Sequence, residues 1–421
     1  MNEKQKVGVL SLRALPVVIP KLKGQFGGSE TSAWLTAKAL ASLENLDVSL
    51  LTRHHTRQPR QQVDGVEILS DWQLIEIARE SLAGVAELQP EFPWLKIRNF
   101  SPSLFWKIPV LAAVRQFFPN RSYELRENPF IQQFDFDAIL LFGANLVSAK
   151  AILSLKHKKT KTILLIRANA ELNERFAKED DFQNEYGERS EVVRYAISNA
   201  SQIVVQTEHQ QRLLLDHFHR KATVIPNPFD LKSWDQQLSN VEQPKPVETE
   251  NYVLWVGRPD RFHKRPLALL EVAARCPDIP FVMVLNRGVQ EVREEIELIK
   301  TQNVTILDQV PFAKMPQLYK NAIAFAFTGS IEHEGFPNVL LQSAATSTPI
   351  VSLDFLPDLI HRSGGAILSG TTEMMAEDIR SLLLNKEKAE QLGRAGRAMI
   401  EQHIDMHQYA VLLEELTRDN E

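Results

Sequence analysis

Residues 334–342 read EGFPNVLLQ, in which an acid is followed by a Gly-Phe-Pro turn and then by an apolar run with helical spacing. Residues 322–327 before it are typical of a buried parallel strand, and residues 349–353 after it are typical of the next strand. The acid Glu334 and the start of a helix therefore meet at the C-terminal end of a parallel strand, where open α/β sheets bind ligands. Pro337 suits the first helical turn, because its missing N–H would have no intrahelical partner there.

The first turn of this helix favours an anion. Its backbone N–H groups lack acceptors within the helix, and they lie at the positive end of the helix dipole. We therefore expect an anion such as a diphosphate to bind at Phe336, Pro337, Asn338 and Val339. The alternative is an ordinary strand–turn–helix connection that happens to carry an exposed acid.

A second stretch, about eighty residues earlier, points to the same kind of ligand. Residues 252–256 predict a strand, residues 257–264 read GRPDRFHK, and a helix with one apolar face follows. Arg258 and Lys264 flank this connection. Two fixed cations there would neutralise a diphosphate and stabilise it as a leaving group. The alternative is a pair of solvated charges on a loop, which is common for Lys and Arg.

Two more stretches complete a pattern. Residues 26–30 read FGGSE after a strand at 7–11, and residues 224–230 read VIPNPFD. Together with 257–264 and 334–342, in this order, they make the chain resemble a family-4 glycosyltransferase. This family belongs to the glycosyl transferases group 1, which are retaining, nucleotide-sugar-dependent enzymes with the GT-B fold. The resemblance spans nearly the whole chain, and the order of its four motifs makes it specific.

Strand and helix patterns alternate along the chain, which indicates parallel sheets covered by helices. A chain of 421 residues is also longer than one core usually fills. The resemblance implies an α/β GT-B protein with two Rossmann-like domains whose parallel sheets face across a cleft. We expect an N-terminal acceptor-binding domain at 1–228, a linker at 229–250, a nucleotide-sugar-binding domain at 251–402, and a C-terminal helix at 403–421 that crosses back to the first domain.

The pattern also predicts individual elements in the first half of the chain. The expected strands lie near residues 6–12, 46–52, 138–142, 162–166, 202–206 and 222–225. The expected helices lie near residues 29–44, 71–86, 144–155, 187–198 and 207–217. The same alternation continues between 252 and 385, and the polar segment 231–250 lacks either periodicity.

The resemblance implies an enzyme that moves a hexosyl or related group from a nucleotide-diphosphate sugar to an acceptor hydroxyl, with retention of configuration. Cell-surface polysaccharide or glycolipid synthesis is the expected setting. Glu334 would position the sugar, and Arg258 and Lys264 would stabilise the leaving diphosphate. We expect no cofactor and no metal, because no ligand cluster is visible in the sequence and the two cations can take the place of a metal.

Two departures from the family pattern leave an alternative open. The second acid of the last motif is Gln342 here, at a position that the resemblance assigns to the ribose hydroxyls. Gln still offers one acceptor and two donors. Residues 166–171, which read IRANAE, also lack a His that several relatives carry near the reacting sugar. The alternative is a catalytically inactive subunit that binds sugar nucleotides; a sugar-nucleotide epimerase is a more distant one.

Three residues of the N-terminal half complete the expected donor site. Gly27 and Gly28 permit close approach of the backbone to a ligand, and Ser29 is the expected N-cap of the helix that follows. Arg167 ends an apolar strand and is expected at the cleft rim, as a ligand to the donor or to an anionic acceptor. The alternatives are a plain glycine turn and a salt-bridged structural Arg.

Two further segments bear on the acceptor. The basic residues 53–57, RHHTR, suit a phosphorylated or lipid-linked acceptor, although they also fit a solvated loop. Residues 92–118 mix aromatic and basic side chains, which suits either peripheral membrane contact or core packing beneath an insertion. The expected partners are therefore a nucleotide-sugar donor and a glycan, lipid-linked or small-molecule acceptor.

Composition narrows the remaining classes. Hydrophobic residues make up 44% of the chain and charged residues 24%, as in globular proteins. The net charge of −5 argues against nucleic acid as a partner. The single cysteine, Cys276, excludes an internal disulfide. No stretch looks like a signal peptide or a membrane span. We expect a cytoplasmic protein, with peripheral attachment to the inner face of the membrane as an extension of that expectation.

Overall fold

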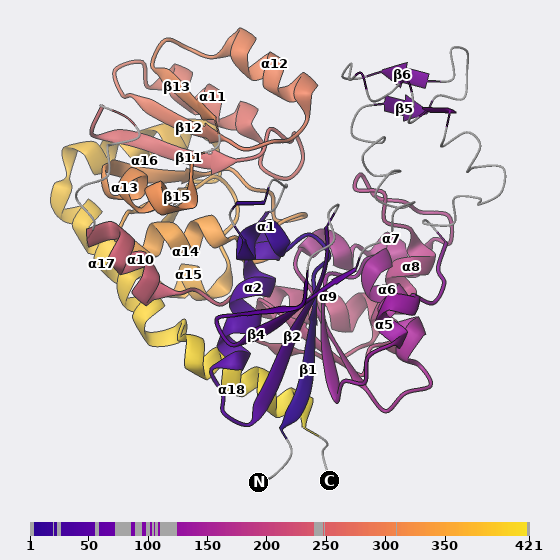
Figure 1. The fold of residues 1–421 in the computed structure, drawn as a ribbon. Helices are drawn as coiled ribbons and strands as arrows, with labels where there is room; N and C mark the ends of the chain where they lie inside the picture. Colours follow the sequence, from indigo (N-terminus) through magenta and orange to yellow (C-terminus); the bar gives the residue numbers. More distant parts are fainter. Residues whose placement is uncertain are drawn as a thin grey trace. The chain divides into compact units, whose positions relative to one another are not determined.

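The computed structural model describes most of the chain (Figure 1). The described residues are 4–19, 21–22, 27–54, 59–71, 86–88, 95–97, 102, 105, 108–109, 124–239, 247, 249–308 and 310–418. The chain divides into two compact units. Unit 1 is Met1–Leu141 with Asn145–Thr162, and unit 2 is Phe142–Ala144 with Ile163–Glu421. The domain boundaries expected from the sequence are a different division of the chain, and they stay a prediction.

Unit 1 is built on a mostly parallel sheet with the strand order β7-β1-β2-β4-β3. Only β3 is antiparallel to its neighbour. Helix α2 packs on the sheet and buries Trp34, Ala37 and Leu40. The strands are β1 (Gln5–Leu10), β2 (Leu46–Arg53), β3 (Gln61–Val63), β4 (Val66–Asp71) and β7 (Ala138–Phe142); β5 (Ala86–Leu88) and β6 (Leu95–Ile97) form a separate pair. The helices are α1 (Leu15–Val18), α2 (Gly28–Ala41), α5 (Pro129–Gln132) and α6 (Leu146–Leu155).

Unit 2 begins with three parallel strands in chain order, β8 (Lys161–Leu165, whose first two residues belong to unit 1), β9 (Gln202–Val205) and β10 (Thr223–Val224). Short helices connect them. These are η1 (Asn169–Leu172), α7 (Glu174–Lys178), α8 (Ser190–Asn199) and α9 (Glu208–Phe218). The apolar runs of β8 and β9 are buried, as expected for parallel strands that are covered on both faces.

A second, six-stranded parallel sheet follows in unit 2, with the order β13-β12-β11-β14-β15-β16. Its strands are β11 (Tyr252–Gly257), β12 (Phe281–Leu285), β13 (Val304–Asp308), β14 (Ala322–Phe327), β15 (Ile350–Ser352) and β16 (Ala366–Leu368). The order reverses after β13, since β14 returns to the other side of β11. This reversal is the topological switch point at which such sheets bind ligands.

Helices cover both faces of the six-stranded sheet (Figure 1). One face carries a core shared with α11 (Pro266–Arg275), α12 (Gln290–Ile299) and α16 (Thr372–Leu384). The other face carries a core shared with α13 (Met315–Lys320), α14 (Asn338–Ala345), α15 (Asp358–Ser363) and α17 (Lys386–His403). A 3-10 turn, η2 (Phe312–Lys314), precedes α13. The alternation expected between 252 and 385 is confirmed, and the two open parallel sheets have the GT-B architecture.

One expectation about the linker is wrong. Segment 231–250 was expected to lack secondary structure, but α10 (Leu231–Ser239) forms there. Leu231, Trp234 and Leu238 follow helical spacing, and Trp234 is 1% exposed because it packs against Phe229 and Tyr319. Arg397 of α17 binds Asp235 in a bidentate ion pair. This pair joins α10 to a helix that packs on the six-stranded sheet. The helix was missed because its polar face dominates its composition.

Other expectations for unit 1 are corrected by the structure or concern residues outside the described part of the chain. Strand β4 was not expected, and the helix expected at 71–86 lies outside the described residues except for Asp71 and Ala86, which belong to strands. Helix α2 begins at Gly28 with Gly27 as its N-cap, so Ser29 is not the cap. Glu30 accepts the Gly27 N–H at 2.8 Å, which is the half of a capping box that needs no N-cap side chain.

The two segments proposed for the acceptor remain largely undecided. Within 53–57, Arg53 is paired with Asp71 at 3.1 Å and His54 is 6% exposed, so these two residues do not form a solvated loop. Residues 55–57 lie outside the described residues. Of the segment 92–118, the structure describes only 95–97, 102, 105 and 108–109. No helix among the described residues combines the length and apolarity needed to cross a membrane.

Candidate functional site

The first half of the site is the loop between β11 and α11, at residues 258–265. Buried β11 ends at Gly257, where a Cβ would lie 2.5 Å from the Trp255 ring, so the chain turns at a position that only glycine fits. Asp260 holds the loop by accepting N–H bonds from Phe262 and His263, at 3.0 and 2.8 Å. Because the loop leaves the C-terminal end of β11, it carries its charged residues to the edge of the sheet at which the strand order reverses.

The second half is the loop between β14 and α14, at residues 328–337. Its central acid, Glu334, is 4% exposed and forms an ion pair with Lys264 from the first loop. His263 contacts the other carboxylate oxygen through Nε2 at 3.0 Å. Burial raises the pKa of the Glu334 carboxyl, but Lys264 and then His263 outweigh burial and lower the pKa to about 2. Glu334 is therefore a charged, buried carboxylate.

Backbone and hydroxyl hydrogen bonds join the two loops. The Ser330 N–H donates to the His263 carbonyl at 3.0 Å, and the Thr328 hydroxyl donates to the Lys264 carbonyl at 2.7 Å. The Trp255 indole in turn donates to Thr328 Oγ1 at 2.9 Å. These bonds fix the backbone on both sides of the Lys264–Glu334 pair. The backbone positions of Lys264 and Glu334 are therefore fixed by the hydrogen bonds between the two loops.

Arg265 adds a further connection from a strained position. It is the N-cap of α11, and its backbone is left-handed, with φ of 46° and ψ of 57°. Its guanidinium donates to the carbonyls of Thr328 and Gly329, at 2.6 and 3.0 Å, and binds Asp354 through both carboxylate oxygens. The loops after β11, β14 and β15 are therefore held together by one side chain.

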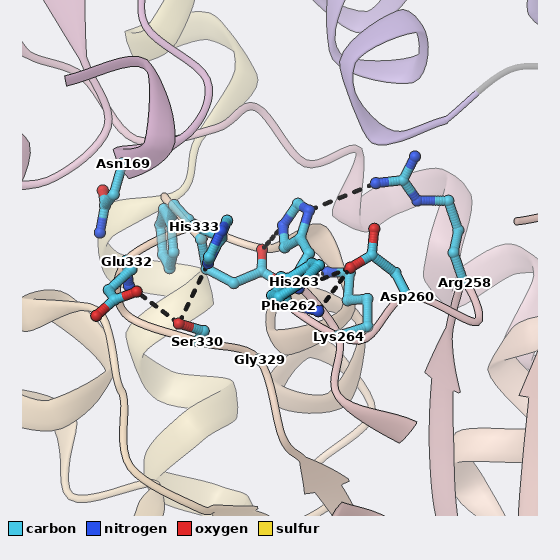
Figure 2. A network of polar contacts seen from close by, with 12 residues as sticks. Asn169, Arg258, Asp260, Phe262, His263, Lys264, Gly329, Ser330, Glu332 and His333 are labelled. Carbon is cyan, nitrogen blue, oxygen red and sulfur yellow. Dashed lines mark hydrogen bonds and ion pairs between the residues drawn. The ribbon is translucent and has the colours of Figure 1, made fainter. Parts of the chain in front are cut away.

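His263 bridges two of the residues expected to be catalytic (Figure 2). Its Nδ1 faces the guanidinium of Arg258, with Nη2 at 3.4 Å, while its Nε2 contacts Glu334. Arg258 itself is exposed. The three residues expected from the sequence, Glu334, Arg258 and Lys264, thus lie together, and the imidazole of His263 links Arg258 to the other two.

A second imidazole lies beside the first. His333 stacks on His263, with ring centroids 6.1 Å apart, and its Nε2 contacts Glu185 at 2.6 Å. Tyr186 presents its ring edge-on to both imidazoles, at 6.2 and 6.3 Å. Phe262 lies 6.4 Å from His333 and is 59% exposed. The rim of the site beside Glu334 is therefore aromatic.

The turn before α14 is held by hydrogen bonds to unit 2 residues near β9 and β10. The Phe336 N–H donates to Gln206 Oε1 at 3.1 Å. This N–H is therefore not available to an anion, contrary to our expectation. Asn227 donates to the Phe336 carbonyl at 2.7 Å and to Asn338 Oδ1 at 2.9 Å. Helix α14 begins at Asn338 with Pro337 as the N-cap, which leaves Asn338 and Val339 in the first turn.

Arg167 lies close to this turn, and its expected role as a ligand to the donor or to an anionic acceptor stays a prediction. Its guanidinium donates to Asn227 Oδ1 at 2.5 Å and lies 5.5 Å from the Phe142 ring centroid. Burial lowers the pKa of Arg167, and its Nε is buried without a hydrogen-bond partner. The neighbouring carboxylate of Glu171 accepts the backbone N–H of Arg167 and that of Ala144. Arg167 therefore supports the turn through Asn227.

Gln342 lies on α14 and faces Tyr319. The Tyr319 hydroxyl donates to Gln342 Oε1 at 3.0 Å, in a region where Tyr319 is fully buried. This bond occupies a lone pair of the only acceptor atom of the Gln342 side chain and leaves its NH₂ group as the donor. Gly27 and Gly28 belong to unit 1, at the start of α2, and the Gly27 N–H is already bound to Glu30.

Several residues of the site were not predicted. His263 lies within residues 257–264, but only the charged residues Arg258 and Lys264 of this stretch were predicted to act in the site. His333, Glu185 and Tyr186 gave no periodic or motif signal, because they act through a contact between residues far apart in the chain. Among the described residues, no group of three or more His, Cys, Asp or Glu could hold a metal ion. The expectation that no metal is needed stays a prediction.

Comparison with known proteins agrees with the geometry of unit 2. Residues 237–399 match the family described as Glycosyl transferases group 1. The matched segment contains Arg258, Lys264, Glu334 and Gln342 and is similar to the glycosyl transferases group 1. None of the curated proteins matches the chain at a significant level.

Solved structures match over nearly the full length. Sucrose-phosphate synthase from Thermosynechococcus elongatus shares 17% identity with a TM-score of 0.67, covering 98% of both chains. A mutant of S. aureus TarM, solved in complex with Fondaparinux, alpha-GlcNAc-glycerol and UDP, shares 12% identity with a TM-score of 0.63, covering 99% of this chain and 100% of that chain. The UDP-GlcNAc 2-epimerase from Neisseria meningitidis bound to UDP-GlcNAc shares 14% identity with a TM-score of 0.51, covering 98% of both chains. These likenesses show the fold.

Proposed function

We propose that the protein transfers a sugar from a nucleotide-diphosphate sugar to an acceptor hydroxyl. The observation that carries this proposal is the pairing of buried Glu334 with Lys264, beside Arg258, at the C-terminal ends of adjacent strands β11 and β14. The match of residues 237–399 to the glycosyl transferases group 1 supports the same activity.

In this proposal the diphosphate binds at Arg258, Lys264 and the first turn of α14, where Asn338 and Val339 lie. Negative charge grows on the diphosphate as the glycosidic bond breaks, and fixed cations with helix N–H groups stabilise that charge. Glu334 accepts hydrogen bonds from the hydroxyls of the transferred sugar. The aromatic rim and the donor NH₂ of Gln342 are further contacts for the substrate.

Finer assignments belong to the same proposal. Transfer with retention, a hexosyl donor, a glycan or lipid-linked acceptor, and a place in cell-surface polysaccharide or glycolipid synthesis all follow from the resemblance to the family-4 enzymes. Closure of two domains over the donor would exclude water from the reacting centre. No metal is invoked, because two cationic side chains are available for the leaving group.

The test is nucleotide release from UDP-, GDP- and ADP-sugars, with and without candidate acceptors, in wild type and Lys264→Ala. Acceptor-dependent release from one donor that is lost in the variant supports the transferase. Donor binding without release in the presence of acceptors favours an inactive binding subunit. Turnover of a UDP-sugar without any acceptor, and without nucleotide release, favours an epimerase, an activity carried by one of the proteins with a similar fold.

A further inference from the structure

The two polar contacts of His263 are satisfied by one arrangement of its ring protons. A guanidinium has only N–H donors, so the Arg258 contact at Nδ1 requires an unprotonated nitrogen there. Glu334 is an acceptor because its carboxyl is ionised, so Nε2 carries the proton and donates it at 3.0 Å. This arrangement leaves no place for a second proton at Nδ1 while Arg258 contacts it, and Lys264 is the cation paired with Glu334.

A bound diphosphate would disturb this arrangement, because Arg258 and Lys264 are the cations proposed to bind it. Arg258 is exposed and can turn to the phosphates, which frees the lone pair of Nδ1. Lys264 would then share its charge between the phosphates and Glu334. The buried carboxylate would lose part of its counter-charge at the moment when more negative charge arrives.

We propose that His263 is a positioning residue that takes up one proton from solvent when a nucleoside diphosphate binds. The proton goes to Nδ1, which Arg258 vacates, and the imidazolium then keeps the Glu334 carboxylate in place through Nε2. Diphosphate binding is thereby linked to the position of the carboxylate proposed to hold the sugar. This inference rests on the proposed function of Arg258 and Lys264.

The charges around His263 favour this step. Glu334 faces Nε2 from the β14–α14 loop, and Asp260 lies in the same loop as His263. The other neighbours are rings: His333, whose own Nε2 is paired with Glu185, and Tyr186, which meets His263 edge-on. The opposing charges are Lys264 and Arg258, both of which would be neutralised by the diphosphate. The balance therefore shifts toward the imidazolium on binding.

Isothermal titration calorimetry measures the proton directly. UDP, GDP and ADP are titrated at pH 7.5 in buffers of different ionisation enthalpy, and the slope gives the protons exchanged. For the nucleotide that binds most tightly, we expect wild type to take up as much as one proton more than His263→Gln. Gln can still donate a hydrogen bond to Glu334 but cannot gain a charge. The matched control, His403→Gln, changes an exposed histidine at the end of α17 and should keep the wild-type value.

The pH dependence of binding gives a second measurement. If one proton is taken up, the Kd of wild type should rise by up to about tenfold per unit of pH above neutrality, and the Kd of His263→Gln should change less. A circular dichroism spectrum and an unfolding curve establish that each variant is folded. The absence of uptake by wild type would overturn the inference without any variant, so the proposal can be refuted even if His263→Gln fails to fold.

The outcomes separate this inference from the proposed function. Binding of a nucleotide without proton uptake by wild type overturns the inference and leaves the transferase proposal standing. Equal uptake by wild type and His263→Gln, or equal loss in His263→Gln and His403→Gln, overturns the assignment to His263. If no nucleoside diphosphate binds, both the inference and the proposed diphosphate site fail.

Discussion

Lys264 and Glu334 form an ion pair across seventy residues of sequence, with Glu334 only 4% exposed. An ammonium and a carboxylate at this depth stabilise the fold only as a pair, because removing either leaves the other charge buried without compensation. The pair also joins the two loops that follow β11 and β14. Both stability and activity should therefore respond when it is broken, and the two responses can be separated.

Loss of Lys264 should remove catalysis. We expect Lys264→Ala to lower turnover by roughly 10²–10³-fold, the effect of losing one preorganised group that stabilises charge in the transition state. Nucleotide release from the preferred donor is the measurement. Lys386→Ala, at an exposed position at the start of α17, is the control and should match wild type. Wild-type turnover in Lys264→Ala would refute the role of this ammonium.

Arg258→Ala should lower turnover on the same scale of roughly 10²–10³-fold, but without a comparable loss of stability. The reason is that Arg258 is exposed and its side-chain contact with His263, at 3.4 Å, is a long one. Steady-state nucleotide release and thermal unfolding, measured together, test this. A large drop in the unfolding temperature, with turnover unchanged, would assign Arg258 to the fold and not to the reaction.

The buried carboxylate should make stability depend on acid. The pKa of Glu334 is lowered from 4.5 to about 2, so the folded protein releases this proton more readily than the unfolded chain. The resulting stability is fully present above pH 4.5 and is lost as the pH falls toward 2. Urea unfolding of wild type and Glu334→Gln should show a free-energy difference at pH 6 that shrinks at pH 3. A constant difference would contradict the shifted pKa.

Glu171 should have the opposite dependence. Burial raises the pKa of its carboxyl to about 7, although the N–H groups of Ala144 and Arg167 favour the ionised form. The folded state therefore holds this proton more tightly than the unfolded chain, and stability is lost as the pH rises from 4.5 through 7. Relative to Glu171→Gln, wild type should lose unfolding free energy between pH 5 and pH 8. An unchanged difference across that range would refute the raised pKa.

Gly335 should not tolerate a side chain. A Cβ there would lie 2.1 Å from Gln206 Oε1 and 2.6 Å from Gln210 Nε2. We expect Gly335→Ala to destabilise the protein by about 1–3 kcal/mol, as for an overpacked core, and to weaken nucleotide binding. Because the clash involves Gln206, Gly335→Ala combined with Gln206→Ala should lose less than the sum of the single variants. Strictly additive losses of unfolding free energy would show that the strain does not arise from the contact with Gln206.

The parallel sheets and the three charged residues of the site could be predicted from the sequence. Buried parallel strands are near-continuous apolar runs, and a charged residue just after such a run must lie at the edge of the sheet. Arg258, Lys264 and Glu334 each follow a run of this kind. Strand β4 escaped prediction because its sequence, VEILSD, is only partly apolar.

The partners within the site could not be predicted in the same way. The Glu185–His333 contact joins residues about 150 positions apart, and no local pattern encodes it. The turn at Phe336 shows a different difficulty. A helix N-terminus offers N–H groups in general, but whether a particular one is free depends on a distant side chain, here Gln206. The sequence therefore indicates where a helix N-terminus lies, but which of its N–H groups are free depends on the tertiary structure.

Asn227 uses every hydrogen-bonding position of its carboxamide. Its oxygen accepts from Arg167 and Gln206, each at 2.5 Å, and its nitrogen donates to the Phe336 carbonyl and to Asn338. A saturated carboxamide cannot exchange partners without losing a bond, so the turn at 336–338 has one favoured position. The first turn of α14 is then in place before a ligand arrives. Binding there carries little cost of ordering the backbone, and discrimination among anions must come from the side chains that surround them.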